Sequence, residues 1–266
     1  MTAISTSSTS IPASSRPERT YCSKASIRDQ PIRLTATSDR SNVFNAGSMK
    51  RATTIAALSV ALFAPASAGA APIELGVGQP LPAASCPADC TAIGKVTGFQ
   101  VSDGVKSHPM RVNREGHIVA FTVKLGKPNA EQIKFFERLF GSPAKVRVAI
   151  LRPATPQKGF KLKRVSEEFN VSRFFGKSPT FALSKPLPIG VKYEVALTTS
   201  TWAPLLSVKR TPKEGWRSSR DPGKCDDVQE PSALEAIGNR RAFSCLHSTA
   251  RLLYTATFVP NPTPNK

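Results

Sequence analysis

Four cysteines carry the most specific chemistry in this sequence. Cys86 and Cys90 lie four positions apart, and Cys225 and Cys245 lie twenty apart. In an oxidising compartment an even number of cysteines favours two disulfides, for which three pairings exist. We expect Cys86 to pair with Cys90 and Cys225 with Cys245, because each pair closes a local loop. A clamp between the two ends of the chain is an alternative, and so is a zinc site, although the spacing is poor for a zinc knuckle.

An acidic segment, RDPGKCDDVQE, contains the residues that could bind a metal ion through oxygen. They are Asp221, Asp226, Asp227 and Glu230. Carboxylates on a flexible loop suit calcium, but this spacing differs from that of an EF-hand. We favour a solvated acidic loop and keep calcium as the alternative, with no other cofactor expected.

Two tryptophans and nearby basic residues are candidate ligand contacts. Trp202 in TSTWAPLL and Trp216 with Arg217 in KEGWRSSR lie in or beside expected loops. Flat rings flanked by Arg and Ser are typical of sugar-binding faces. Lys161 and Lys163 belong to a basic strand that could contact an anionic ligand. Either tryptophan could instead be structural, and for Trp202 we favour a plug at one end of a sandwich.

No catalytic residue is expected. The three histidines, His108, His117 and His247, do not have metal-binding spacing, and no G-x-S-x-G elbow occurs. Glu167 and Glu168 are neighbours, so on an extended segment they point to opposite sides. A glycan hydrolase with carboxylates that only folding brings together remains an alternative.

An export signal precedes the cysteines. Residues 49–71 begin at Met49 with a positive region formed by Lys50 and Arg51, continue through an apolar core that Pro65 ends, and finish with small residues that a signal peptidase accepts. A membrane anchor is the alternative, but a span needs about 20 apolar residues and this core is about half as long. We therefore expect a cleaved signal peptide and no transmembrane span after processing.

Composition sets the other boundaries. Residues 1–48, which include Cys22, are rich in Ser and Thr and have no apolar period. They are either a disordered leader or the product of a mis-assigned start codon, in which case translation begins at Met49. We expect a secreted or cell-envelope protein. The alternative is a two-part address that leads to an organelle lumen. The expected parts that follow are a Pro/Ala-rich lead-in at 72–91, one domain at 92–259 and a loose tail at 260–266.

The chain is strongly basic. Its net charge is +19, and the part after residue 71 keeps 29 basic and 15 acidic residues, a net +14. Outside the cytoplasm such charge favours anionic wall polymers, lipid headgroups or acidic glycans, although it could merely keep the protein soluble. No zinc-finger spacing or aromatic and basic RNA-binding pattern occurs, so we expect no nucleic-acid partner.

Period-2 patterns dominate the part after the signal. Alternating apolar residues predict strands with one buried face over 95–102, 117–125, 145–152, 159–165, 179–184, 190–199, 241–247 and 251–259. In the strand over 117–125 the pattern places His117, Val119 and Phe121 on that face. One amphipathic helix is expected near 129–140, with Asn129 as its cap and Gly141 after it. The fold class is therefore all-β, an antiparallel sandwich of jelly-roll or Greek-key type.

The runs REGHIVAFTVKLG, VRVAILRP and PLPIGVKYEVALTTSTWAP resemble secreted, jelly-roll-like β-sandwich proteins of actinobacterial type, which are largely uncharacterised. The resemblance covers residues 92–259. It implies the fold and secretion only, and it transfers no catalytic residues.

These observations favour a secreted, non-catalytic binding module for anionic cell-wall or extracellular glycans, with Lys161, Lys163, Trp202, Trp216 and Arg217 as its contacts. A structural or protein-interaction sandwich of the cell envelope is the alternative, and a glycan hydrolase is the second. The sequence does not predict an oligomeric state.

Overall fold

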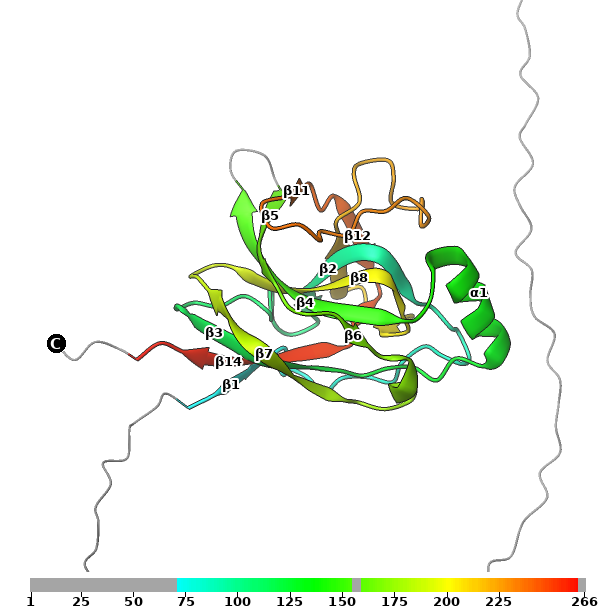
Figure 1. The fold of residues 1–266 in the computed structure, drawn as a ribbon, viewed down its shortest axis with the longest axis horizontal. Coiled ribbons are helices and arrows are strands. Elements are labelled where there is room, and N and C mark those ends of the chain that lie inside the picture. Colours follow the sequence, from blue (N-terminus) through cyan, green and yellow to red (C-terminus); the bar gives the residue numbers. More distant parts are fainter. Residues whose placement is uncertain (1–70, 155–158, 263–266) are drawn as a thin grey trace, which may run out of the picture. The chain divides into compact units, whose positions relative to one another are not determined.

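The computed structural model describes residues 71–154 and 159–262. All of them belong to one unit that spans Phe63–Lys266. The expected leader, all but the last residue of the signal, and most of the tail lie outside the described residues. Within this unit two antiparallel sheets pack against each other with one α-helix at their side, so the predicted all-β sandwich is confirmed (Figure 1).

The smaller sheet has four strands in the order β1-β14-β3-β7. Their bounds are β1 Ile73–Leu75, β14 Tyr254–Pro260, β3 Gly116–Val123 and β7 Thr180–Ile189. Strand β1 lies in the expected lead-in and pairs with β14, with Leu75 opposite Ala256. The first and last strands among the described residues are therefore neighbours in one sheet.

The larger sheet has eight strands, seven of them in the order β11-β5-β4-β8-β2-β10-β12 and the eighth, β6, paired with β4. Their bounds are β11 Arg240–Arg241, β5 Gly159–Val165, β4 Lys145–Ala154, β8 Glu194–Ala203, β2 Ile93–Asp103, β10 Glu214–Ser218, β12 Cys245–Ser248 and β6 Phe169–Asn170. A 3-10 helix covers Ser172–Phe174, and a separate pair joins β9 (Leu206–Ser207) to β13 (Arg251–Leu252).

Both faces of the larger sheet are covered. In β8, Val195 and Leu197 belong to the main core between the sheets, whereas Ala196 belongs to a second cluster with Phe99 and Phe243. Alternate residues of a strand point to opposite faces, so this second cluster lies on the outer face of the larger sheet. The segment 219–244 between β10 and β12 covers it, and we call this segment the excursion.

The helix α1, Ala130–Phe140, forms where it was predicted. Asn129 accepts from the Gln132 N–H at 2.9 Å, and the Gln132 side chain accepts from the Asn129 N–H at 2.9 Å, which completes a capping box. Phe136 and Phe140 are buried against the sandwich. No helix among the described residues is long and apolar enough to cross a membrane.

Replacing the cap tests this local prediction. We expect Asn129→Ala to lower the free energy of unfolding by about 1 kcal/mol, because the first turn loses a hydrogen-bond acceptor. Urea denaturation followed by circular dichroism measures the change. Asn129→Ser is the control, since serine also caps helices and should retain most of the stability. Equal losses in both variants would contradict a capping role.

The described residues contain two disulfides, Cys86–Cys90 and Cys225–Cys245. The local pairing expected from the sequence is confirmed. The second disulfide ties the excursion to the first residue of β12.

Strand β3 is not in the expected register. His117 and Val119 are only half-buried, whereas Ile118, Phe121 and Val123 are fully buried. A bulge between Ile118 and Ala120 shifts the pairing with β7, and it inverts the faces of the strand's first residues. The expectation that His117 lies on the core face is therefore wrong.

The strand predicted over 190–199 begins later than expected. Residues 190–193 form a turn in which Lys192 has φ 66° and Val191 is 45% exposed, and β8 starts at Glu194. The apolar residues of the sequence alternate through residues 190–193 as they would in a strand, although the chain turns there. Trp216 lies within β10 rather than in a loop.

Candidate functional site

A cavity of about 900 Å³ lies where the β2–β3 loop meets the β7–β8 turn. Its polar lining is basic: Lys106, His108, Arg111, Arg114 and Lys192, with Ser107 and Asn113. None of its lining residues is an Asp or Glu. We call this cavity the basic pocket. It concentrates positive charge without a carboxylate at its surface, so it attracts anions.

Backbone hydrogen bonds fix the two segments that carry these cations. The N–H of Lys192 donates to the Val112 carbonyl at 2.9 Å, and the N–H of Val112 donates to the Tyr193 carbonyl at 3.2 Å. The Val195 N–H also donates to the Met110 carbonyl at 3.1 Å. Residues 112–116 and 190–193 therefore stand together as one structure, which we call the ridge. Lys192 therefore projects from a backbone whose hydrogen bonds are formed within the protein, and Arg114 lies two residues from the bonded Val112.

A buried carboxylate lies beneath the basic pocket. Glu194 is fully buried, and its Oε1 accepts from Arg111 Nε at 2.7 Å and lies 2.6 Å from His108 Nδ1. The Glu194 Oε2 has no hydrogen-bond partner among the described residues. Buried charges need a partner, so Glu194 holds Arg111 and His108 in place while their side chains remain about one third exposed. Arg111 thus presents an oriented guanidinium toward the pocket.

One wall of the basic pocket is apolar. It consists of Ile73 and Leu75 from β1, Val112 and Val191 from the ridge, and Phe258 from β14. Ile73 and Val191 are among the exposed large hydrophobic residues of the described chain. A pocket with an apolar wall and convergent charged groups suits a ligand with both a hydrocarbon face and anionic substituents. A sugar ring that carries a carboxylate has this character.

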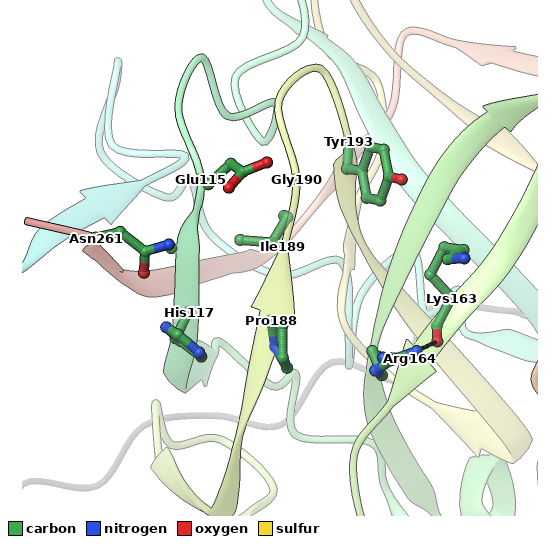
Figure 2. Close-up of a pocket in the computed structure, with 10 residues that line it drawn as sticks. Glu115, His117, Lys163, Arg164, Pro188, Ile189, Gly190, Tyr193 and Asn261 are labelled. Atoms are coloured by element: carbon green, nitrogen blue, oxygen red, sulfur yellow. Dashed lines mark hydrogen bonds between the residues drawn. The ribbon is translucent and has the colours of Figure 1, made fainter. Parts of the chain in front are cut away.

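The predicted lysines lie on β5, and neither lines the basic pocket. Lys163 lines a second cavity together with Arg164 and Tyr193 (Figure 2). Lys161 is opposite Arg240 in the pairing of β5 with β11. The structure thus brings Lys163, but not Lys161, to the end of the sandwich where the ridge lies.

Both tryptophans are buried. Trp202 is 0% exposed and packs between Phe136 and Phe175, with ring centroids 5.0 and 5.5 Å away. Trp216 is 5% exposed and stacks on His247 at 4.2 Å. Arg217, also predicted as a contact, donates instead to the carbonyls of Phe243 and Ser244 at 3.1 Å. Rings without a free face cannot stack on a sugar in this conformation, so neither tryptophan contributes a contact to the site.

A serine and a histidine lie together beside Trp216. Ser218 Oγ is 3.0 Å from His247 Nε2, the spacing of a nucleophile and its base. Burial lowers the pKa of His247, and the charge of Arg220 acts in the same direction, while that of Asp226 opposes it. Ser218, however, is fully buried in β10 and no carboxylate among the described residues hydrogen-bonds to His247. This pair therefore lacks both substrate access and an orienting acid.

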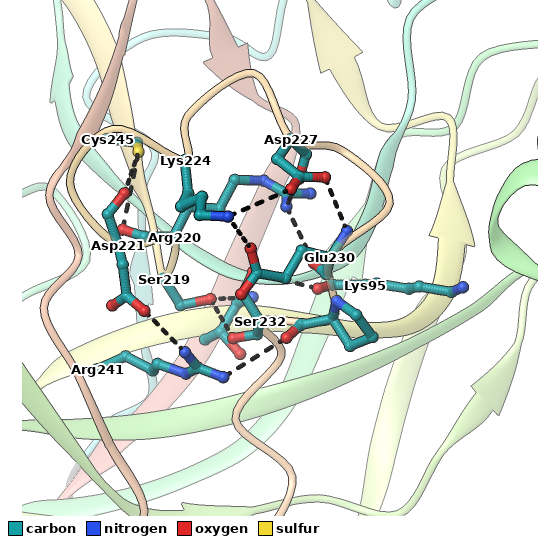
Figure 3. Close-up of polar contacts among 12 residues, drawn as sticks. Lys95, Ser219, Arg220, Asp221, Lys224, Asp227, Glu230, Ser232, Arg241 and Cys245 are labelled. Carbon is teal, nitrogen blue, oxygen red and sulfur yellow. Dashed lines mark hydrogen bonds and ion pairs between the residues drawn. The ribbon is translucent and has the colours of Figure 1, made fainter.

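Three of the four predicted acidic residues belong to a polar network in the excursion (Figure 3). Asp221 pairs with Arg241 at 3.1 Å, while Asp227 and Glu230 pair with Lys224 at 3.8 and 3.4 Å. Asp226 is exposed. Among the described residues no group of three His, Cys, Asp or Glu side chains could hold a metal ion. The side chains of Lys224 and Arg241 pair with the carboxylates of this solvated loop. Calcium binding stays an untested alternative.

Sequence reasoning missed every cation of the basic pocket. The segment KSHPMRVNRE contains Lys106, His108, Arg111 and Arg114 between two predicted strands, and this density of basic residues was the available signal. Glu194 gave no signal, because an acidic residue on an alternating strand is ordinarily assigned to the solvent face.

Comparisons with protein-family models, curated proteins and solved structures found no match for this chain. The resemblance to secreted actinobacterial sandwiches therefore stays a prediction.

Proposed function

We propose that this chain is a secreted, non-catalytic module that binds anionic polysaccharide in the basic pocket. One observation carries the proposal: a cavity of about 900 Å³ is lined by four Lys or Arg side chains and one His, with no carboxylate among its lining residues. Arg111 is held in place by Glu194, so part of the orientational cost of binding is already met.

Two further features support a polysaccharide as the anion. The apolar wall of the pocket favours a ligand with C–H faces over a bare inorganic anion. The disulfides fit an oxidising compartment, where wall polymers and acidic glycans are the abundant polyanions. A structural or protein-interaction role in the cell envelope is the alternative, for which no described surface provides a specific argument.

A double substitution at the ridge tests the proposal. We expect Arg114→Gln with Lys192→Gln to weaken binding of polygalacturonate about tenfold at low salt, because two exposed cations are lost from the pocket. Isothermal titration of the disulfide-intact protein measures the affinity, at low and at 0.5 M salt. Dextran, a neutral glucan, should not bind.

The matched control removes the same two charges elsewhere. Lys134→Gln with Arg138→Gln alters helix α1, which lies at the other end of the sandwich from β1 and the end of β14 (Figure 1). This variant should bind polygalacturonate nearly as the parent protein does. If both double variants lose affinity equally, only the overall charge matters and the pocket is not the site. Absence of binding by the parent protein would move the envelope interaction role to first place.

A further inference from the structure

A second cavity, of about 310 Å³, lies across the ridge from the basic pocket. Lys163 and Arg164 from β5 and Tyr193 from the ridge lie on one side of the end of β7, as Figure 2 shows. Glu115 and Asn261 lie on the other side. Glu115 directly precedes β3, and Asn261 directly follows β14. The cavity is thus lined by strands of both sheets, β3 and β7 of the smaller one and β5 of the larger one.

The ridge is the common wall of the two cavities. Arg114 and Lys192 line the basic pocket, whereas their sequence neighbours Glu115 and Tyr193 line the second cavity. Backbone hydrogen bonds from Lys192 to Val112 and from Val112 to Tyr193 hold the two segments of the ridge together between the cavities. One ligand that occupies both cavities must therefore pass over the ridge, within reach of its two cations.

The second cavity has the chemistry of a sugar subsite. The Tyr193 ring is half-buried and rests on Gly190, where an added Cβ would lie 3.3 Å from the ring. An aromatic ring in a fixed position stacks on the C–H face of a sugar. Lys163 and Arg164 can pair with an anionic substituent, and Glu115 and Asn261 can bind hydroxyl groups. The carboxylate of Glu115 repels anionic groups, so it disfavours a ligand that is negatively charged along its whole length, such as a polyphosphate.

We propose that this cavity is a second subsite for the same ligand, and that the ligand is a linear anionic polysaccharide which crosses the ridge, rather than a single sugar acid. The inference rests on the proposed function. It adds a length requirement: a short oligomer fills one cavity, while a longer one fills both.

Titration with galacturonate oligomers of two lengths tests this inference. We expect the disulfide-intact protein to bind the octamer about a hundredfold more tightly than the dimer, because the second contact becomes intramolecular. In Lys163→Gln with Arg164→Gln the affinity for the octamer should fall about tenfold and that for the dimer should stay unchanged. Both side chains lie on the surface of β5, and unchanged urea denaturation would verify the fold. Lys134→Gln with Arg138→Gln again serves as the charge-matched control.

The outcomes separate the two proposals. If neither oligomer binds, the proposed function itself fails. Equal affinity for dimer and octamer in the parent protein would overturn the second subsite while leaving the basic pocket in place. A loss of octamer affinity in the control variant as large as that in the β5 variant would also overturn it, because general charge would then explain the effect. Tyr193→Leu provides an independent check, since loss of the ring alone should reduce octamer affinity and spare dimer affinity.

Discussion

Trp202→Ala should lower the free energy of unfolding by about 3–5 kcal/mol, the largest loss that we expect from one substitution in the described residues. The indole is fully buried between Phe136 of α1 and Phe175, which follows the 3-10 helix. Removing it leaves a cavity at the junction of β8 with both helical segments. Urea denaturation under oxidising conditions, followed by circular dichroism, measures the loss.

Trp202→Phe is the informative companion. The Trp202 Nε1 has no hydrogen-bond partner among the described residues, so phenylalanine removes volume but no hydrogen bond. It should cost less than half as much as alanine. If Trp202→Ala cost less than about 1 kcal/mol, the ring would not be packed as described. If it abolished oligomer binding in a protein that remained folded, Trp202 would have to be returned to the binding site.

Arg220→Met should cost about 3 kcal/mol and should open the excursion. Arg220 is 5% exposed, and its guanidinium donates to the carbonyls of Glu230, Val228 and Gly94 at 3.1, 3.2 and 3.3 Å, and to that of Asp227 (Figure 3). Burial lowers the pKa of Arg220, while the carboxylates of Asp227 and Glu230 oppose that effect. Methionine fills similar space but leaves these carbonyls without their donor.

Limited proteolysis measures this opening. Cleavage within residues 221–242 should be faster in Arg220→Met than in the parent protein, with the Cys225–Cys245 disulfide intact in both. Arg240→Met removes an exposed arginine from strand β11 within the excursion and is the control, with little expected change. Unaltered cleavage in Arg220→Met would show that the disulfide and the outer cluster alone hold the excursion. Arg220→Lys should behave as an intermediate, since an ammonium group cannot reproduce the planar fork.

Local patterns predicted the elements well. The capping box at Asn129 and Gln132 involves groups three residues apart, and β5 occupies the predicted residues 159–165. The disulfides followed because each pair lies close in sequence. Short patterns failed where the chain turns or bulges: alternation continued into residues 190–193, and the bulge in β3 inverted the face of His117.

The sequence by itself determined the fold class, the helix and the disulfide pairs of this protein, because these depend on spacings within a few to about twenty residues. Only the tertiary structure decided the candidate site. Arg111, Arg114 and Lys192 come from two loops that meet because β8 joins the large sheet beside β2 while β3 and β7 pair in the other sheet. Which loops meet depends on the order of the strands in the two sheets. A period-2 pattern predicts the face of the sheet on which a residue lies, but it does not predict which strand lies beside it.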